Sequence, residues 1–175
     1  MEDNYQNNRT VYGRFMFNLT VKGSDFLFKN MWLYYLLSYT WGLLTTIVGW
    51  LVYLFIRIFL FKLVKEHNKF GPCYYVMIGD NWGGLEMGTN FLIANNMGSS
   101  WTLHTKCHEC GHTFQNAILG PFAIILCFIP SFTRYWYQII AKKNGKPVKP
   151  YDQIWFEGSA TAIGTNYYNT KNKLK

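Results

Sequence analysis

Residues 30–56, "NMWLYYLLSYTWGLLTTIVGWLVYLFI", contain no charged side chain. A membrane-spanning helix needs about 20 consecutive apolar residues, and this run is longer than that. A buried core helix is the alternative, but such helices seldom run so long without a polar face. Trp and Tyr crowd the first half of the run, as they do where a helix meets the bilayer interface. The run therefore predicts an N-terminal transmembrane helix, which together with its amphipathic continuation occupies residues 30–64; the amphipathic pattern ends at Gly71-Pro72.

Basic residues flank this run unevenly. Lys22 and Lys29 precede it, whereas Arg57, Lys62, Lys65 and Lys69 follow it closely. Because cytoplasmic flanks carry the excess of Lys and Arg, the C-terminal side is predicted to be cytoplasmic. The run begins about thirty residues into the chain and is too long for a cleaved signal, so it is interpreted as an anchor.

The chain carries a net charge of +8 and 19 % aromatic residues. A basic chain can meet nucleic acid or an anionic membrane surface. Here the basic residues gather around the apolar run and in loops, and no nucleic-acid-binding motif is present. The sequence therefore predicts a lipid bilayer as a partner, and no nucleic acid.

The remaining chain predicts an α+β domain over residues 65–175, preceded by a polar, loosely structured arm over residues 1–29. Two strand-like runs, residues 73–79 and 85–94, are separated by the turn-rich "DNWGG", which favours a short antiparallel pair. Helices are expected over residues 100–119 and again from about residue 151. The apolar segment 120–140 contains Pro130 and Arg134, so it is expected to pack on the domain or dip into the membrane interface.

The first of these helices carries "HECGH", in which His108, Glu109 and His112 form the pattern HExxH. An α-helix turns by about 100° per residue, so the two histidines lie one turn apart on a single face. Their imidazoles can grip one metal ion, and Glu109 lies slightly round the helix from them. This placement suits a general base that takes a proton from a metal-activated water.

A catalytic zinc ion needs a third protein ligand, and only two acidic residues follow the motif. Glu157 lies in the later helix, after a loop long enough to fold back, whereas Asp152 is interpreted as a helix cap. His104 would lie about 12 Å along the axis from His112 in a continuous helix, too far to share an ion. A bend before Cys107 would remove that objection.

Cys107 and Cys110 fall on the back of the same helix, away from the histidine pair. They cannot share a metal ion with the histidines unless the helix breaks. Buried packing is the preferred interpretation, because free cysteine is among the most buried residue types. A thiol-based redox or metal-sensing membrane protein remains an alternative.

The fuller pattern "HECGHTFQ…LGP…FEGSATAIG" is similar to small bacterial membrane proteins with H-E-x-G-H-x-x-Q and E-x-x-A-[DN]-x-x-G. HExxH followed by E-x-x-A resembles the gluzincin metallopeptidases of the integral-membrane HtpX and CAAX-prenyl-protease type. The resemblance covers roughly residues 74–165. It implies a minimal zincin-like domain, with His108, His112 and Glu157 as Zn²⁺ ligands and Glu109 as the general base.

One position departs from that pattern, because Thr161 stands where the family has Asp or Asn. In the family this residue is expected to orient a histidine ligand through a hydrogen bond, which a hydroxyl replaces weakly. Gln115 lies on the histidine face and either orients a ligand or solvates the groove. The resemblance also implies that the strand at residues 85–94 binds the substrate backbone.

These features predict a membrane-anchored, zinc-dependent endopeptidase of a bacterial inner membrane, acting on peptides or membrane proteins. The alternative within the same fold is a non-catalytic zinc-binding protein. Neither the substrate specificity nor the oligomeric state follows from the sequence.

Overall fold

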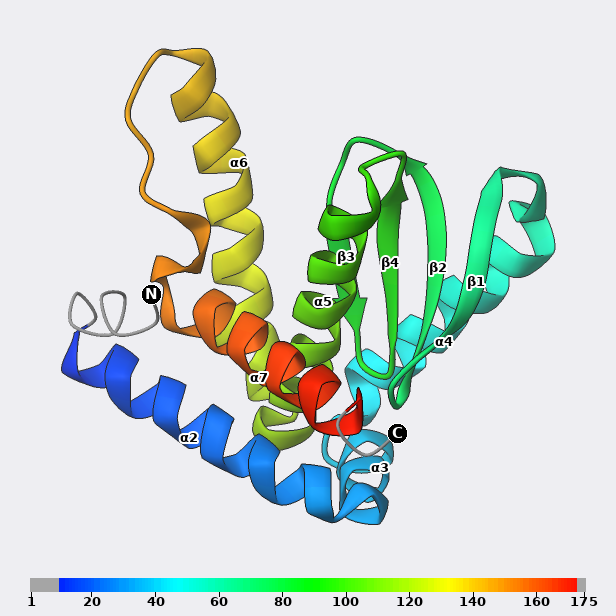
Figure 1. Cartoon of the computed structure of the whole chain (residues 1–175), viewed down its shortest axis with the longest axis vertical. Coiled ribbons are helices and arrows are strands. Elements are labelled where there is room, and N and C mark those ends of the chain that lie inside the picture. The colour runs from blue at the N-terminus through cyan, green and yellow to red at the C-terminus, as the bar shows by residue number, and fades with distance from the viewer. Residues whose placement is uncertain (1–9, 173–175) are drawn as a thin grey trace.

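The computed structural model describes residues 10–172 and is an α+β arrangement of six helices around a four-stranded mixed sheet (Figure 1). The strands are β1 (Val64–Phe70), β2 (Cys73–Asp80), β3 (Gly84–Met87) and β4 (Asn90–Asn95), in the spatial order β1-β2-β4-β3. β2 pairs with β4 in parallel, whereas β1–β2 and β3–β4 are antiparallel. β3 therefore forms one edge of the sheet.

The predicted antiparallel pair is wrong in two respects. Residues 85–94 form two strands, because the chain reverses at Gly88, whose φ of 70° favours glycine. The partner of β2 is consequently the second of these strands, and it runs parallel to β2. The stretch after the apolar run is also a strand, β1, rather than an amphipathic helical continuation.

The described part of the N-terminal arm is helical, which contradicts the predicted loose structure. α2 (Val11–Lys29) begins at Thr10, whose hydroxyl accepts a hydrogen bond from the Gly13 N–H at 3.1 Å. Met16, Phe17 and Leu27 bury one side of the helix in the core. Residues 1–9 of the predicted arm lie outside the described residues.

The apolar run does not form one straight span. α3 (Met31–Tyr39) and α4 (Leu43–Phe59) meet at an angle of 85°, and a short 3₁₀ turn, η1 (Phe61–Leu63), leads from α4 into β1. The bend has polar partners, since the Thr46 hydroxyl donates to the Ser38 carbonyl at 2.8 Å and the Thr45 hydroxyl to Asn116 Oδ1 at 2.7 Å. Tertiary hydrogen bonding thus stabilises the break that local hydropathy does not reveal.

The segment 120–140 is helical throughout most of its length. A π-helical turn, η2 (Ile124–Phe128), continues into α6 (Ile129–Lys143), and Pro130, which has no backbone N–H to donate, lies just after the π turn. Residues 124–143 are apolar and long enough to cross a membrane, and α3 with α4 also qualify if counted as one bent span. Core helices of soluble proteins meet the same criteria of length and composition.

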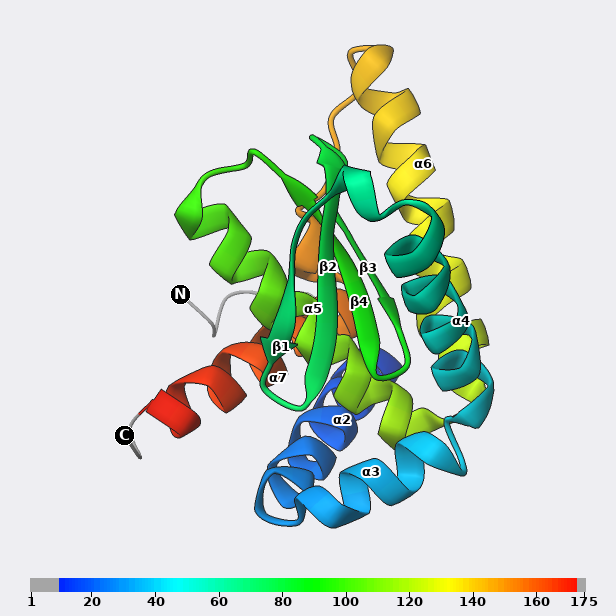
Figure 2. The ribbon, with the colours of Figure 1, turned by 90° about the vertical axis from the view of Figure 1, so that its right-hand side faces the viewer.

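The remaining helices, α5 (Ser99–Leu119) and α7 (Trp155–Asn172), lie at the centre of the molecule, with η3 (Tyr151–Gln153) leading into α7. α5 packs on β3 and β4, and α7 crosses α5 (Figure 1). Phe91 and Ile93 of β4 pack with Phe114 of α5 and Ile163 of α7 in the main core cluster. α4 and α6 lie toward the same side of the molecule in Figure 2, and Figure 1 shows that they diverge from each other.

Candidate metal centre

α5 is a continuous helix through the HExxH motif, and it presents both histidines on one face. The Nε2 atoms of His108 and His112 are 3.1 Å apart, and both rings are mostly shielded from solvent. The helical geometry expected from the spacing is therefore observed.

Two glycines allow α7 to approach α5 closely enough to complete the site. A Cβ at Gly111 would lie 1.9 Å from the Ala160 carbonyl oxygen, and one at Gly164 would lie 1.7 Å from the Cys107 carbonyl oxygen. Neither position can carry a side chain unless the helices separate. This contact brings the first turn of α7, with Glu157, against the histidine face of α5.

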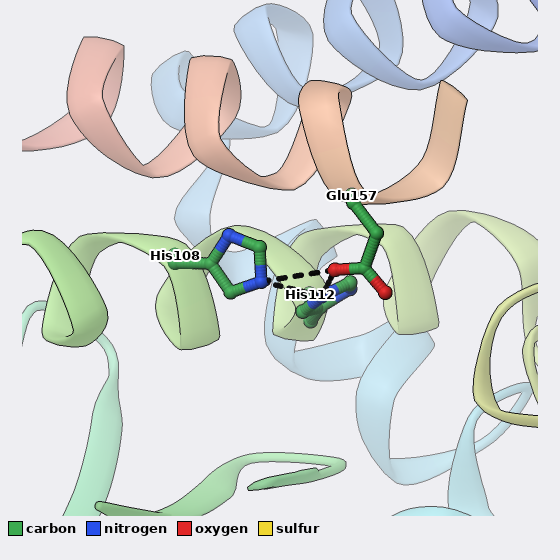
Figure 3. A group of neighbouring side chains, drawn as sticks. All are labelled: His108, His112 and Glu157. Atoms are coloured by element: carbon green, nitrogen blue, oxygen red, sulfur yellow. Dashed lines mark hydrogen bonds and ion pairs between the residues drawn. The ribbon is translucent and has the colours of Figure 1, made fainter. Parts of the chain in front are cut away.

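Glu157 points between the two imidazoles (Figure 3). Its Oε2 atom is 3.1 Å from His108 Nε2 and 3.3 Å from His112 Nε2. The potential ligand atoms of the three residues lie within 4.8 Å of one another, so the group could hold a metal ion. Glu157 Oε1 is buried without a hydrogen-bond partner among the described residues, which leaves a second carboxylate oxygen available as a ligand.

Both imidazoles are held from behind by residues singled out in the sequence. His108 Nδ1 lies 2.8 Å from the Thr161 hydroxyl, and His112 Nδ1 lies 2.8 Å from Gln115 Oε1. The Gln115 amide nitrogen is already committed to the Phe156 carbonyl and the Ser159 hydroxyl, both at 2.7 Å. We therefore assign a proton of the His112 ring to Nδ1, which leaves Nε2 as the nitrogen that faces Glu157 and that can bind a metal ion.

Electrostatics link the three ligand residues. Burial alone would lower the pKa of His112, but the hydrogen bond and charge of Glu157 outweigh it and raise the pKa to about 9. Burial opposes ionisation of Glu157 as well, yet its contacts with both histidines hold its pKa well below the usual range. Without a metal ion, the cluster therefore favours one bound proton beside an ionised carboxylate, and a cation can replace that proton.

Glu109 lies between this cluster and the edge strand β3. Its carboxylate accepts a hydrogen bond from the backbone N–H of Glu86, and burial raises its pKa. A Cβ at Gly84 would come within 2.2 Å of Glu109 Oε1, so the glycine makes room for the carboxylate. The carboxylate is buried at the junction of α5 and β3.

Two further residues near the cluster, Glu86 and Tyr151, were not predicted from the sequence. Glu86 of β3 is half-buried with its Oε1 atom enclosed, and burial together with the charge of Glu109 raises its pKa to about 8 against the opposing effect of His112. Tyr151 lies beside Glu157, since burial and that carboxylate both raise the pKa of its phenol. The Tyr151 and Ser131 hydroxyls are 2.9 Å apart. No local pattern marks either residue, because the sheet and the α6–α7 connection bring them in.

The other candidate residues lie outside the cluster. His104 is exposed, with its ring centroid 6.4 Å from that of His108, and among the described residues neither His104 nor Asp152 belongs to the metal group. Cys107 and Cys110 are buried behind the histidine face, where burial raises the pKa of Cys107 to about 11. Cys110 Sγ lies 3.9 Å from Cys73 Sγ. Such buried thiols behave as packing groups.

Comparison of the chain with protein-family models, curated proteins and solved structures found no match. The function must therefore be inferred from the geometry of the cluster. Two imidazoles and one carboxylate converge, the Glu109 carboxylate lies beside them, and each imidazole has its own hydrogen-bond partner.

Proposed function

We propose that the chain is a zinc-dependent endopeptidase, with His108, His112 and Glu157 as zinc ligands and Glu109 as the general base. The observation that carries the proposal is the convergence of three ligand atoms on one point, next to a buried carboxylate. A purely structural carboxylate–histidine contact does not require a second buried carboxylate beside it.

The ligand set favours zinc over other common ions. Two imidazoles and a carboxylate make the three-ligand set of catalytic zinc, whereas Ca²⁺ and Mg²⁺ take oxygen ligands. When bound, zinc lowers the pKa of water and polarises a carbonyl group. Gln115 favours the tautomer of His112 that such binding requires, and the Thr161 hydroxyl can accept the Nδ1 proton of His108.

Glu109 takes the proton of the attacking water and passes it to the leaving amine. Its burial supports this role, because a raised pKa brings a carboxylate closer to the value that proton shuttling requires. Tyr151 supplies a phenolic O–H beside Glu157, which suits hydrogen bonding to the developing oxyanion.

β3 is suited to bind the substrate backbone. Its one neighbour in the sheet is β4, so its other edge is free to pair with an extended peptide. Because Gly84 of this strand contacts Glu109, a peptide bound along β3 would run past the general base. Peptides and extended segments of membrane proteins are the proposed substrates.

The first experiment measures zinc per chain in detergent for the wild type, Glu157→Ala and His104→Ala. His104→Ala is the matched control, since it removes an imidazole from the same helix without touching the cluster. Near-stoichiometric zinc in the wild type and His104→Ala, with a large loss in Glu157→Ala, is expected. Equal zinc in all three proteins would remove Glu157 from the ligand set.

The second experiment tests catalysis with Glu109→Gln and a peptide library as substrate. Retained zinc with hydrolysis lowered by at least about a hundredfold is expected if Glu109 moves the proton. Zinc binding without hydrolysis by the wild type would favour the non-catalytic zinc protein of the same fold.

A further inference from the structure

The outward surface of α4 is apolar along its whole length. Its inner face carries small or buried residues, including Thr46, Gly49 and Ile56, which contact the rest of the protein. Its outer face consists of exposed apolar side chains: Leu44, Ile47, Val48, Leu51, Leu54, Phe55, Ile58 and Phe59. A helix on the surface of a water-soluble protein shows the opposite arrangement, with polar residues outward.

α6 and the π turn before it present a second surface of the same kind. The exposed side chains here are Phe122, Ile125, Phe128, Ile129, Phe132, Tyr135, Trp136, Tyr137, Ile139 and Ile140. The two helical segments start next to each other, with the rings of Trp41 and Phe122 6.0 Å apart, and both lie on one side of the molecule (Figure 2). Their outer faces together are named the apolar platform.

Basic residues gather where both helices end. Arg57, Lys62 and Lys65 follow or close α4, and Lys142, Lys143 and Lys146 close or follow α6. Both helices run toward the same end of the molecule (Figures 1 and 2), so these cations border one end of the apolar platform. An apolar surface with a cationic border is complementary to a bilayer that contains anionic headgroups.

The sheet argues against a helix that crosses the bilayer. A Cβ at Gly49, midway along α4, would lie 2.0 Å from the Met87 carbonyl oxygen, and the Trp50 and Tyr74 rings are 5.3 Å apart. β3 and β4 therefore lie alongside α4. If α4 crossed the membrane, these strands and the edge of the sheet at β3 would enter hydrocarbon, where open sheet edges do not occur. α4 is also only 17 residues long, shorter than the usual span of about 20.

We propose that the chain is a monotopic membrane protein whose apolar platform lies in one leaflet, with α4 and α6 along the bilayer surface. The basic border contacts anionic lipid headgroups, and the sheet and metal cluster stay on one side of the membrane. This arrangement replaces the predicted single span with two helices lying in the interface, and it does not depend on metal binding or catalysis.

Single-cysteine labelling distinguishes this arrangement from a span. Thr40→Cys and Lys62→Cys place exposed thiols before and after α4, whereas the four native cysteines are buried and give a low background. The full chain is expressed in bacteria, and its membranes are prepared as sealed inverted and right-side-out vesicles. A membrane-impermeant maleimide is expected to label both variants in the same vesicle preparation. Labelling of one variant from each side would overturn the proposal in favour of a span.

Flotation with lipid vesicles tests the chemistry of the surface. The detergent-purified chain is mixed with vesicles of phosphatidylcholine, alone or with one-third phosphatidylglycerol, and the detergent is removed. Leu51→Glu/Phe132→Glu is expected to lose most vesicle binding. Thr165→Glu/Asn169→Glu adds the same charge to exposed positions of α7 and is expected to bind as the wild type does.

Lys62→Gln/Lys143→Gln tests the basic border in the same assay. Only the gain from phosphatidylglycerol is expected to fall, by about fivefold for each lysine. An unchanged midpoint of thermal unfolding in every variant shows that the protein remains folded. If the wild type stays in solution as a dimer and binds neither kind of vesicle, a second copy covers the platform and the proposal fails.

Discussion

The helix pair α5–α7 buries polar side chains, whereas the helix pair α4–α6 exposes apolar ones. α5 and α7 meet through Gly111 and Gly164 and bury a polar cluster between them. α4 and α6 diverge from a shared starting point (Figure 1), and their large apolar side chains are exposed. The difference teaches that hydropathy alone does not tell which helices form the core, because α4, the most apolar helix, turns most of its large side chains away from it.

Glycine serves both pairs, but with different partners. Gly164 brings one helix against another, whereas Gly49 brings α4 against the turn between β3 and β4. In both places a missing side chain allows backbone to approach backbone. The first contact assembles the candidate site, and the second fixes the apolar platform relative to the sheet.

The largest effect is expected from Gly164→Ala, which pushes α5 and α7 apart. Its new Cβ would overlap the Cys107 carbonyl oxygen, so the free energy of unfolding should fall by about 3 kcal/mol and zinc binding should be lost. Thr165→Ala, at the adjacent exposed position, should change little. Thermal unfolding and zinc content check both variants, and an unchanged Gly164→Ala would contradict the observed packing.

A strong pH dependence of zinc affinity is the next largest expectation. The pKa of His112 is about 9 without metal, so zinc must displace a proton at any pH below that value. Protonation competes with the metal, and affinity should therefore fall as pH falls, by about tenfold per unit between pH 8 and pH 6. Competition with a chelator at each pH measures the slope. A flat profile would show that His112 does not bind the ion.

The hydrogen bond between His108 and Thr161 should have a smaller effect. Thr161→Val keeps the shape of the side chain but removes the oxygen 2.8 Å from Nδ1, which should weaken zinc binding by about tenfold. Thr161→Asp restores the acidic residue of the resembled pattern and should strengthen zinc binding. Chelator competition measures both changes, and equal affinities in all three proteins would leave Thr161 without an orienting role.

The smallest effect is expected on the apolar platform in detergent. Leu54→Ala removes an exposed side chain and should change the free energy of unfolding by less than about 0.5 kcal/mol. Ile56→Ala, two residues along the same helix but buried, should cost about 2 kcal/mol or more. Denaturant unfolding compares the two, and equal losses would mean that both faces of α4 pack against protein.

The ligand geometry followed from the sequence because it depends on local rules. Helical periodicity places His108 and His112 on one face, and the small residues of "EGSATAIG" allow α7 to pack closely beside Glu157. The contacts of Thr161 and Gln115 with the histidines also agree with the positions predicted for them. Their roles in catalysis stay predictions.

The failures of prediction share a non-local cause. The bend before α4 depends on Asn116, more than 70 residues away, and the β2–β4 pairing depends on a chain reversal at Gly88. Tyr151 and Glu86 reach the site through the α6–α7 connection and the sheet edge. Such long-range contacts cannot be predicted from local composition. The α+β class and the helices that carry His108, His112 and Glu157 could be predicted, because they follow from local sequence patterns.

The order of elements along the chain has a consequence for biosynthesis. α5 is made first with two of the proposed ligands, then the apolar segment that becomes α6, and only afterwards Glu157. A nascent chain that has not yet produced α6 holds an incomplete set of ligands. If the apolar platform reaches the bilayer as it is made, the third ligand arrives on a chain that is already at the membrane. Maturation of the metal centre would then be timed to follow membrane arrival.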